Sequence, residues 1–283
     1  EYWPPKPRVV GSIPASRTIP SFYRRQEPKV SVFQAETSRI RATGHIRPPV
    51  FLTTSQPALR TFLTSLLIAT AQLAFALEPV RDQEIAQCLP GEMVTWGDGQ
   101  DRPAISSPMV FVYDHAMAPA WFAESLVLST VEKAAQAWSG CGVASRVLRG
   151  TAEAGWSQGA ILVRWSEKGS ASNFGLANLT QRTLSLGPAA FQMLKQHNPS
   201  YDARQTLQMV ISHEMGHLFG LMAHSRRCVD VTSYYDNGRG EKCQMRDVSQ
   251  RSAFTEYRAV LPTACDLQRC RIANATDSAS TRP

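Results

Sequence analysis

The chain has 283 residues, of which 43% are hydrophobic and 19% are charged. A chain of this length and composition can bury a sizeable core, which excludes a disordered, collagen-like or polytopic membrane protein. The formal net charge is +7, but residues 1–60 carry ten Lys and Arg against three Glu, which leaves 20 basic and 20 acidic residues after them. The basic character therefore belongs to the first fifth of the chain, and we expect no nucleic-acid partner for the rest.

Residues 1–59 are rich in Pro, Ser and Arg and show no sustained helical or strand period. They contain no Met, and the first Met in the chain is Met93. We expect a disordered or non-native leader here, and a basic binding arm is the alternative interpretation.

Residues 60–76 read RTFLTSLLIATAQLAFA, a basic residue followed by a short apolar stretch and a small-x-small ending, Ala74-Phe75-Ala76. This pattern is typical of a secretory signal peptide, here cleaved before Leu77. The stretch is shorter than the roughly 20 apolar residues that a transmembrane helix needs. We therefore expect a secreted or periplasmic protein with no stable membrane anchor after cleavage.

The cysteines support export independently. All six lie after residue 76, and an even count there is typical of an oxidising compartment. The sequence alone cannot choose the pairing. Proximity in the sequence favours Cys228–Cys243 and Cys265–Cys270, which leaves Cys88 to pair with Cys141.

Residues 77–283 are expected to form one domain without internal repeats. Short apolar or alternating runs predict strands at residues 108–113 and 160–165, and one or two more between 174 and 186. Apolar residues at helical spacing predict helices over residues 121–139, 202–220 and 249–261. This order of strands and helices indicates an α+β, or mixed α/β, domain.

The second predicted helix carries the residues with recognisable chemistry. His213 and His217 are four apart, so both imidazoles leave one face of the helix and can share one Zn²⁺. Glu214 lies about 100° around the helix from His213, near enough to hold the water of a zinc site and take its proton.

A third zinc ligand is expected beyond the end of this helix. Gly220 can adopt positive φ and turn the chain back, so that His224 completes a three-histidine site. Asp230 is the substitute if the loop does not bring His224 in. Three protein ligands leave a fourth position open for water, which is typical of a catalytic rather than a structural zinc.

The run His213-Glu214-x-x-His217-x-x-Gly220, followed by His224-Ser225, resembles the metzincin metalloproteases, most closely the matrixin-like group. The resemblance is looser upstream, at residues 131–139, 160–165 and 175–177, and extends over residues 108–260. It implies a metzincin-like zincin domain, with a twisted, mostly parallel sheet packed on two long helices. After the active-site helix it implies a loop with a Met-turn and then a C-terminal helix.

The sequence departs from the family in two places. The family's third histidine stands three residues after the glycine, where this chain has Ala223, and His224 follows one position later. Met245 is the best match to the methionine of the Met-turn, under the metal site, but the usual flanking residues are absent.

By this resemblance the protein is expected to be a zinc metalloendopeptidase in which Glu214 acts as general base. Its partner would be a polypeptide substrate lying extended against an edge strand near residues 174–179, and the protein is expected to be a monomer. The alternative from another class is an exported, non-catalytic zinc-binding module. It would be a degenerate metzincin in which the one-residue shift of the third histidine removes the open coordination position of the zinc. The intact Glu214 argues against that alternative, because a purely structural site has no use for an acid there.

Overall fold

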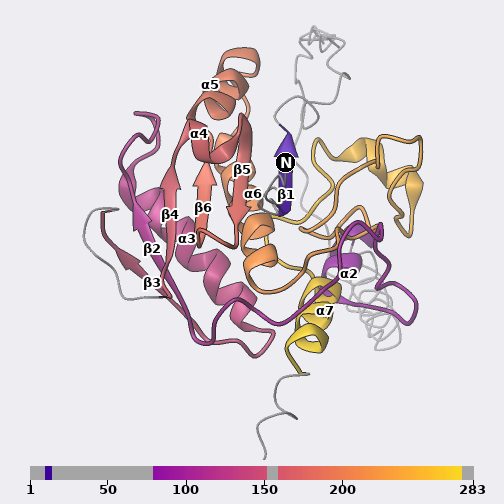
Figure 1. The fold of residues 1–283 in the computed structure, drawn as a ribbon. Coiled ribbons are helices and arrows are strands. Elements are labelled where there is room, and N and C mark those ends of the chain that lie inside the picture. Colours follow the sequence, from indigo (N-terminus) through magenta and orange to yellow (C-terminus); the bar gives the residue numbers. More distant parts are fainter. Residues whose placement is uncertain (1–9, 15–78, 152–158, 276–283) are drawn as a thin grey trace, which may run out of the picture. The chain divides into compact units, whose positions relative to one another are not determined.

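The computed structural model describes residues 10–14, 79–151 and 159–275, and its centre is a six-stranded sheet (Figure 1). The strand order is β1-β5-β6-β4-β2-β3. The parallel strands are β2 (Met109–Asp114), β3 (Ser145–Arg149), β4 (Ile161–Trp165) and β6 (Thr183–Leu186). At one edge, β5 (Asn173–Asn178) runs antiparallel to β6, and β1 (Val10–Pro14) runs antiparallel to β5.

Two long helices pack on each other and on this sheet. They are α3 (Glu124–Ser139), which contacts β3, and α6 (Ala203–Leu218), which contacts β5 and β6. Trp138 of α3 joins them, because its indole Nε1 donates to the carbonyl of Ser212 at 2.8 Å and its ring lies 5.8 Å from that of Phe219. From Thr206 to its end α6 is buried all round, so the helix that carries His213 and His217 is the central helix of the core.

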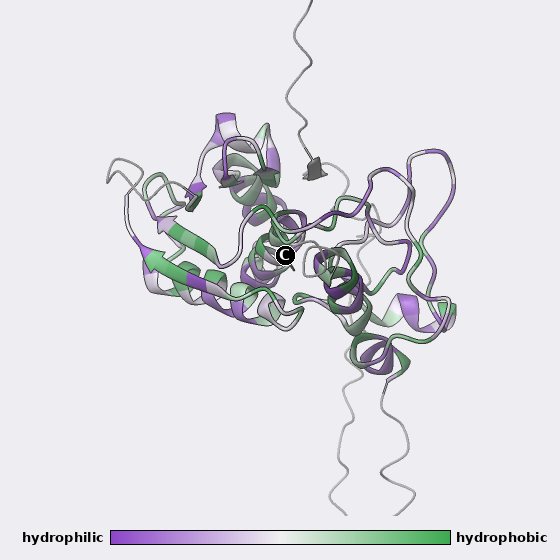
Figure 2. Cartoon of the chain, turned by 60° about the horizontal axis from the view of Figure 1, so that its bottom comes forward, coloured by the Kyte–Doolittle hydropathy of each residue, from purple (hydrophilic) through white to green (hydrophobic). Residues whose placement is uncertain are grey.

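The mixed α/β class and the mostly parallel sheet are thus confirmed, and the predicted strands and both long helices occur within a few residues of their expected bounds. Two strands and four helices were not predicted: β1, β3, α2 (Val80–Ala86), α4 (Glu167–Ser170), α5 (Pro188–His197) and α7 (Ala264–Ala275). Figure 2 shows both hydrophobic and hydrophilic residues on the helices.

The helix predicted over residues 249–261 is wrong. That segment contains a 3₁₀ helix, η1 (Val248–Ala253), and the C-terminal helix α7 starts only at Ala264. Thr263 and Asp266 cap α7 reciprocally: Asp266 N donates to Thr263 Oγ1 at 3.2 Å, and Thr263 N donates to Asp266 Oδ2 at 3.0 Å. This Thr-x-x-Asp pattern follows Pro262 directly and is a capping-box signal that the periodicity argument missed.

Three disulfides use all six cysteines: Cys88–Cys265, Cys141–Cys270 and Cys228–Cys243. Only the predicted Cys228–Cys243 is confirmed, and the other two predicted pairs are wrong. Cys265 and Cys270 lie five positions apart on α7, so their side chains leave the helix about 140° apart and reach different segments. Three disulfides point to an extracellular or otherwise oxidising compartment.

Two predictions concern the chain before residue 79. The signal peptide at residues 60–76 lies outside the described residues, as does most of the leader. Within the leader, where no strand was expected, Val10–Pro14 forms β1, with Val10 opposite Ala177 and Pro14 opposite Asn173.

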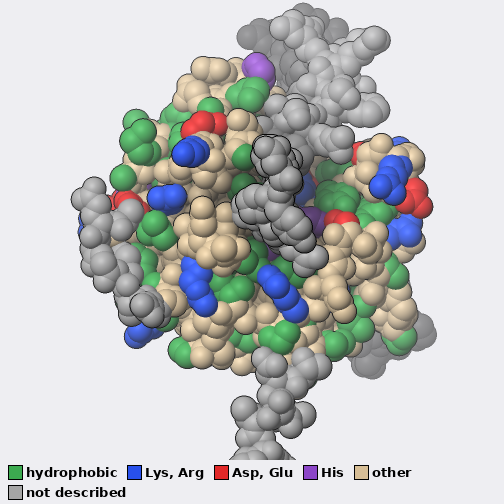
Figure 3. All heavy atoms as spheres, in the orientation of Figure 1, with side chains coloured by type: hydrophobic (Ala, Val, Ile, Leu, Met, Phe, Trp, Pro, Cys, Tyr) green, Lys and Arg blue, Asp and Glu red, His purple; other side chains and the backbone are tan. Residues whose placement is uncertain are grey.

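In the described ranges, no helix combines the length and the apolar character that crossing a membrane requires. On the face drawn in Figure 3, Lys and Arg side chains are dispersed among the other types and do not gather in one patch.

Candidate metal centre

The structure brings the three predicted histidines together. Helix α6 supplies His213 and His217, and the turn that follows it supplies His224. All three are buried, their ring centroids lie 5.0 to 5.2 Å apart, and their candidate ligand atoms lie within 4.8 Å of one another. The two histidines one turn apart and the histidine beyond the helix therefore face one common point.

Each imidazole is oriented through its Nδ1 atom. The acceptors are the carbonyl oxygen of Val231 for His213 (2.8 Å), that of Leu221 for His217 (2.7 Å) and Asp98 Oδ2 for His224 (2.7 Å). Because a carbonyl or carboxylate oxygen only accepts, Nδ1 carries the proton and the lone pair lies on Nε2. The three Nε2 atoms are buried and have no hydrogen-bond partner within the described residues.

This arrangement could hold a metal ion. Three imidazoles whose unpartnered Nε2 atoms converge are the ligand set of a three-histidine metal site with one open position. Burial, with the neighbouring histidines, holds the pKa of His213 well below 6.5 and lowers that of His217 to about 3. Both rings are therefore neutral at pH 7, as metal binding requires.

Glu214 is held by the edge strand next to the site. Its Oε2 accepts from the backbone N–H of Ala177 in β5 at 2.8 Å, and its Oε1 is buried without a hydrogen-bond partner in the described part of the chain. Gly175 allows β5 to lie this close, because a Cβ there would fall 2.5 Å from Cγ1 of Val210. Burial raises the pKa of Glu214 well above 4.5, so this carboxyl can hold a proton at higher pH than an exposed one.

The turn that delivers His224 starts at Gly220, where φ is +109°. Residues 94–103, which we call the clamp segment, run along this turn. Arg102 N donates to the carbonyl of Gly220 at 3.0 Å, Trp96 N donates to that of His224 at 3.0 Å, and Arg226 N donates back to Val94 at 2.9 Å. The clamp segment therefore supports the backbone at Gly220, where the turn begins, and at His224 and Arg226.

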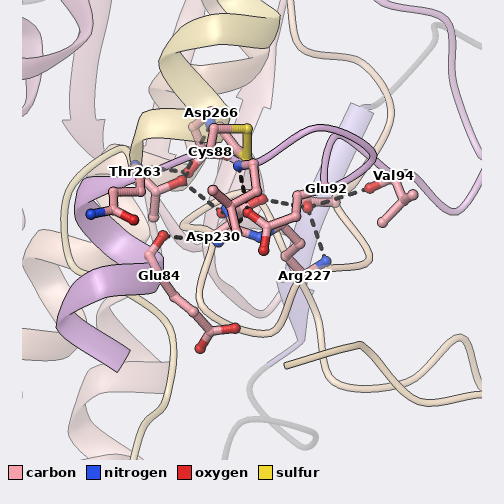
Figure 4. Close-up of a disulfide and its surroundings, with 12 residues drawn as sticks. Glu84, Cys88, Glu92, Val94, Arg227, Asp230, Thr263 and Asp266 are labelled. Carbon is pink, nitrogen blue, oxygen red and sulfur yellow. Dashed lines mark hydrogen bonds and ion pairs between the residues drawn. A yellow bond between two sulfur atoms is a disulfide. The ribbon is translucent and has the colours of Figure 1, made fainter. Parts of the chain in front are cut away.

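Asp230, the substitute ligand, lies outside the histidine group. Its Oδ1 accepts from Arg227 Nη1 at 2.9 Å and from Thr263 Oγ1 at 2.6 Å, and its Oδ2 accepts from Ser225 Oγ at 2.6 Å. Figure 4 shows it in this network beside Asp266 and the disulfide of Cys88. Its oxygens are thus occupied by side chains, and His224 rather than Asp230 lies in the histidine group.

Met245, the predicted methionine of the Met-turn, is partly buried. It packs against a second, small hydrophobic cluster formed by Cys228, Val229 and Tyr257. The backbone that contacts His213 belongs to Val231. The packing of Met245 thus gives no support to its predicted role in a Met-turn.

Sequence reasoning missed the groups that orient the ligands. Most are backbone atoms, such as the carbonyls of Val231 and Leu221 and the N–H of Ala177, and backbone atoms leave no residue-type signal. Asp98 is the exception, in the run Gly97-Asp98-Gly99. A lone Asp between glycines predicts only a turn, so nothing in the sequence connected it with His224.

No protein-family model matches the chain, and no curated protein matches it. Among solved structures, the chain is similar to one described as the GM1-bound form of the ECX AB5 holotoxin, with 13% identity, a TM-score of 0.38, and coverage of 67% of this chain and 92% of that one. It is also similar to myroilysin, with 15% identity, a TM-score of 0.30, and coverage of 70% of this chain and 97% of that one. At TM-scores this low, neither likeness carries an argument about fold or function.

Proposed function

We propose that the protein is a secreted, zinc-dependent endopeptidase of the metzincin type, formed by residues 77–283 after removal of the signal peptide. One observation carries the proposal: within the described residues, the Nε2 atoms of His213, His217 and His224 and the Oε1 atom of Glu214 are all buried without partners. Leaving a buried polar atom unpaired costs about 1–3 kcal/mol. Three histidine ligands and one acid arranged in this way are what a hydrolytic zinc site requires.

The chemistry follows from the roles of these side chains. When bound by the three histidines, Zn²⁺ would act as a Lewis acid that polarises the scissile carbonyl and makes water more acidic. Oε1 of Glu214 would accept a proton from the attacking water and then donate it to the leaving amine. Burial raises the pKa of this carboxyl well above 4.5, which makes its ionised form a stronger base than an exposed glutamate. Ala177 holds the other oxygen, which keeps the carboxylate from rotating away.

The substrate is proposed to lie extended along the outer edge of β5. This edge accepts an antiparallel strand, since β1 pairs with it and places Val10 opposite Ala177. Ala177 also contacts Glu214, so a strand on this edge runs past the general base. A polypeptide there would gain main-chain hydrogen bonds that do not depend on its side chains. Loss of residues 1–76 on export would leave the edge open for substrate.

The test starts from the full chain, exported by a bacterial host and purified from the periplasm or medium. We expect Leu77 at the N-terminus, one zinc per chain and cleavage of casein or gelatin. Glu214→Gln should retain the zinc but lose cleavage by about 100-fold or more, which is the usual contribution of a general base.

The possible results separate the two interpretations of the site. A zinc-loaded protein that cleaves several substrates no faster than Glu214→Gln would be the non-catalytic zinc-binding module. A protein that binds no zinc would overturn both interpretations. His224→Ala should weaken zinc binding, and an unchanged affinity would mean that another residue is the third ligand.

A further inference from the structure

We infer that Asp98 is a positioning residue for the third zinc ligand, fixing the ring orientation and the tautomer of His224. The inference rests on the proposed zinc site and adds to it a residue that lies far outside the zinc motif, 126 positions before His224.

Asp98 contacts His224 through both of its carboxylate oxygens. Asp98 Oδ1 accepts from the backbone N–H of His224 at 2.9 Å, and Asp98 Oδ2 accepts from its ring Nδ1 at 2.7 Å. One carboxylate thus holds both the backbone and the far side of the imidazole. Because Nδ1 must donate in this arrangement, Nε2 keeps its lone pair toward the common point of the three rings.

His224 needs this support more than the other two ligands. His213 and His217 stand on the buried helix α6, which fixes their Cα–Cβ directions, and their Nδ1 atoms meet backbone carbonyls. His224 stands in a turn outside any helix or strand. A carboxylate is a stronger acceptor than a carbonyl, and a carboxylate partner also raises the basicity of a ligating imidazole.

Tyr234 completes the arrangement from the other side. Its hydroxyl donates to the same Oδ2 of Asp98 at 2.7 Å, and its ring centroid lies 4.6 Å from that of His224. Trp96 of the clamp segment stacks on Tyr234 with 5.6 Å between centroids and 6° between planes. The tyrosine therefore restrains the carboxylate by a hydrogen bond and the imidazole by packing.

Asp101 provides a matched comparison within the clamp segment. Its Oδ1 accepts from the backbone N–H groups of Met222 and Ala223 at 2.9 and 3.1 Å, and its carboxylate pairs with Arg269 at 2.8 Å. Asp101 thus holds the same turn through its backbone, whereas Asp98 also contacts the ring. If the orientation of the His224 ring determines zinc affinity, removing the charge of Asp98 should change the zinc Kd more than removing that of Asp101.

The experiment compares Asp98→Asn, Asp101→Asn and Tyr234→Phe in the exported product of the full chain. The zinc Kd is measured by competition with a chelator, the visible spectrum is recorded for the Co²⁺ form, and thermal unfolding is followed without metal. Asp98→Asn should raise the Kd by about 10- to 100-fold and alter the Co²⁺ spectrum, as the loss of an outer carboxylate does elsewhere. Tyr234→Phe keeps the ring and should raise the Kd by less.

For Asp101→Asn we expect a lower Tm of the metal-free protein with a Kd and a Co²⁺ spectrum close to those of the wild type. An unchanged Kd and spectrum for Asp98→Asn would overturn the inference, and so would an equal rise in Kd for Asp101→Asn. If Asp98→Asn does not fold, an unchanged Kd for Tyr234→Phe would overturn it instead. A wild-type protein that binds no zinc would refute the proposed site itself, a result distinct from these.

Discussion

Replacing Gly220 by alanine would disturb the turn that carries His224. An ideal Cβ at this position would lie 1.9 Å from the carbonyl oxygen of Arg102, whereas real Cβ atoms essentially never approach closer than 3.0 Å. The Arg102 carbonyl would therefore have to move by about 1 Å, and the clamp segment would move with it. The backbone hydrogen bond from Arg102 N to Gly220, 3.0 Å long, would be disturbed as well.

The expected cost has two parts. Alanine at φ +109° is strained by about 1–2 kcal/mol, as for other L-residues in this region. Overpacking against a backbone atom adds about 1–3 kcal/mol. We expect Gly220→Ala to lower the free energy of unfolding by about 2–5 kcal/mol. Because Asp98, which contacts the His224 ring, lies in the same segment as Arg102, zinc affinity should fall too.

Gly159→Ala is the matched control. Gly159 has the same φ of +109°, but, apart from the glycine and its two chain neighbours, no atom of the described residues lies within 4 Å of a Cβ built there. Gly159→Ala should lower the free energy of unfolding only by the backbone strain of about 1–2 kcal/mol, and its zinc Kd should be unchanged. Urea unfolding of the metal-free variants and chelator competition measure both quantities. Equal losses of stability in the two variants, or an unchanged zinc Kd in Gly220→Ala, would refute the reasoning.

Three further predictions concern stability and substrate access. Burial lowers the pKa of His217 to about 3, so below pH 6.5 the unfolded metal-free chain binds a proton there that the folded chain does not. The free energy of unfolding should therefore decrease as the pH is lowered from 6.5 toward 3. In urea unfolding at pH 5 and 7, His217→Asn should reduce this dependence by up to about 1.4 kcal/mol per pH unit, and an undiminished dependence would contradict the assignment. Replacing both cysteines of Cys88–Cys265 by serine should cost about 1 kcal/mol more than the same change at Cys228–Cys243, because, with Cys141–Cys270 intact, the first bond closes a loop of about 58 residues and the second one of 15. Equal losses in urea would speak against this chain-entropy argument. Finally, a chain that retains residues 1–76 should cleave casein more slowly than residues 77–283, because β1 occupies the edge of β5. Equal rates would place the substrate elsewhere.

Local patterns were sufficient for the features that depend on neighbours in the sequence. The spacing of His213 and His217 predicts a shared face because one helical turn separates them, and the structure has them on α6. The same holds for α3 and for the central strands, whose apolar periods match the faces that they bury. The pair Cys228–Cys243, only 15 positions apart, also followed from proximity.

The tertiary structure decided what depends on residues far apart in the chain. Cys88 meets Cys265 across 177 positions, and Asp98 meets His224 across 126, so no local period connects either pair. The place of Asp230 outside the histidine group is of the same kind, because the side chains around it come from Ser225, Arg227 and the distant Thr263. A helix sets the spacing of its own residues, but only the packed chain determines which distant carboxylate reaches an imidazole.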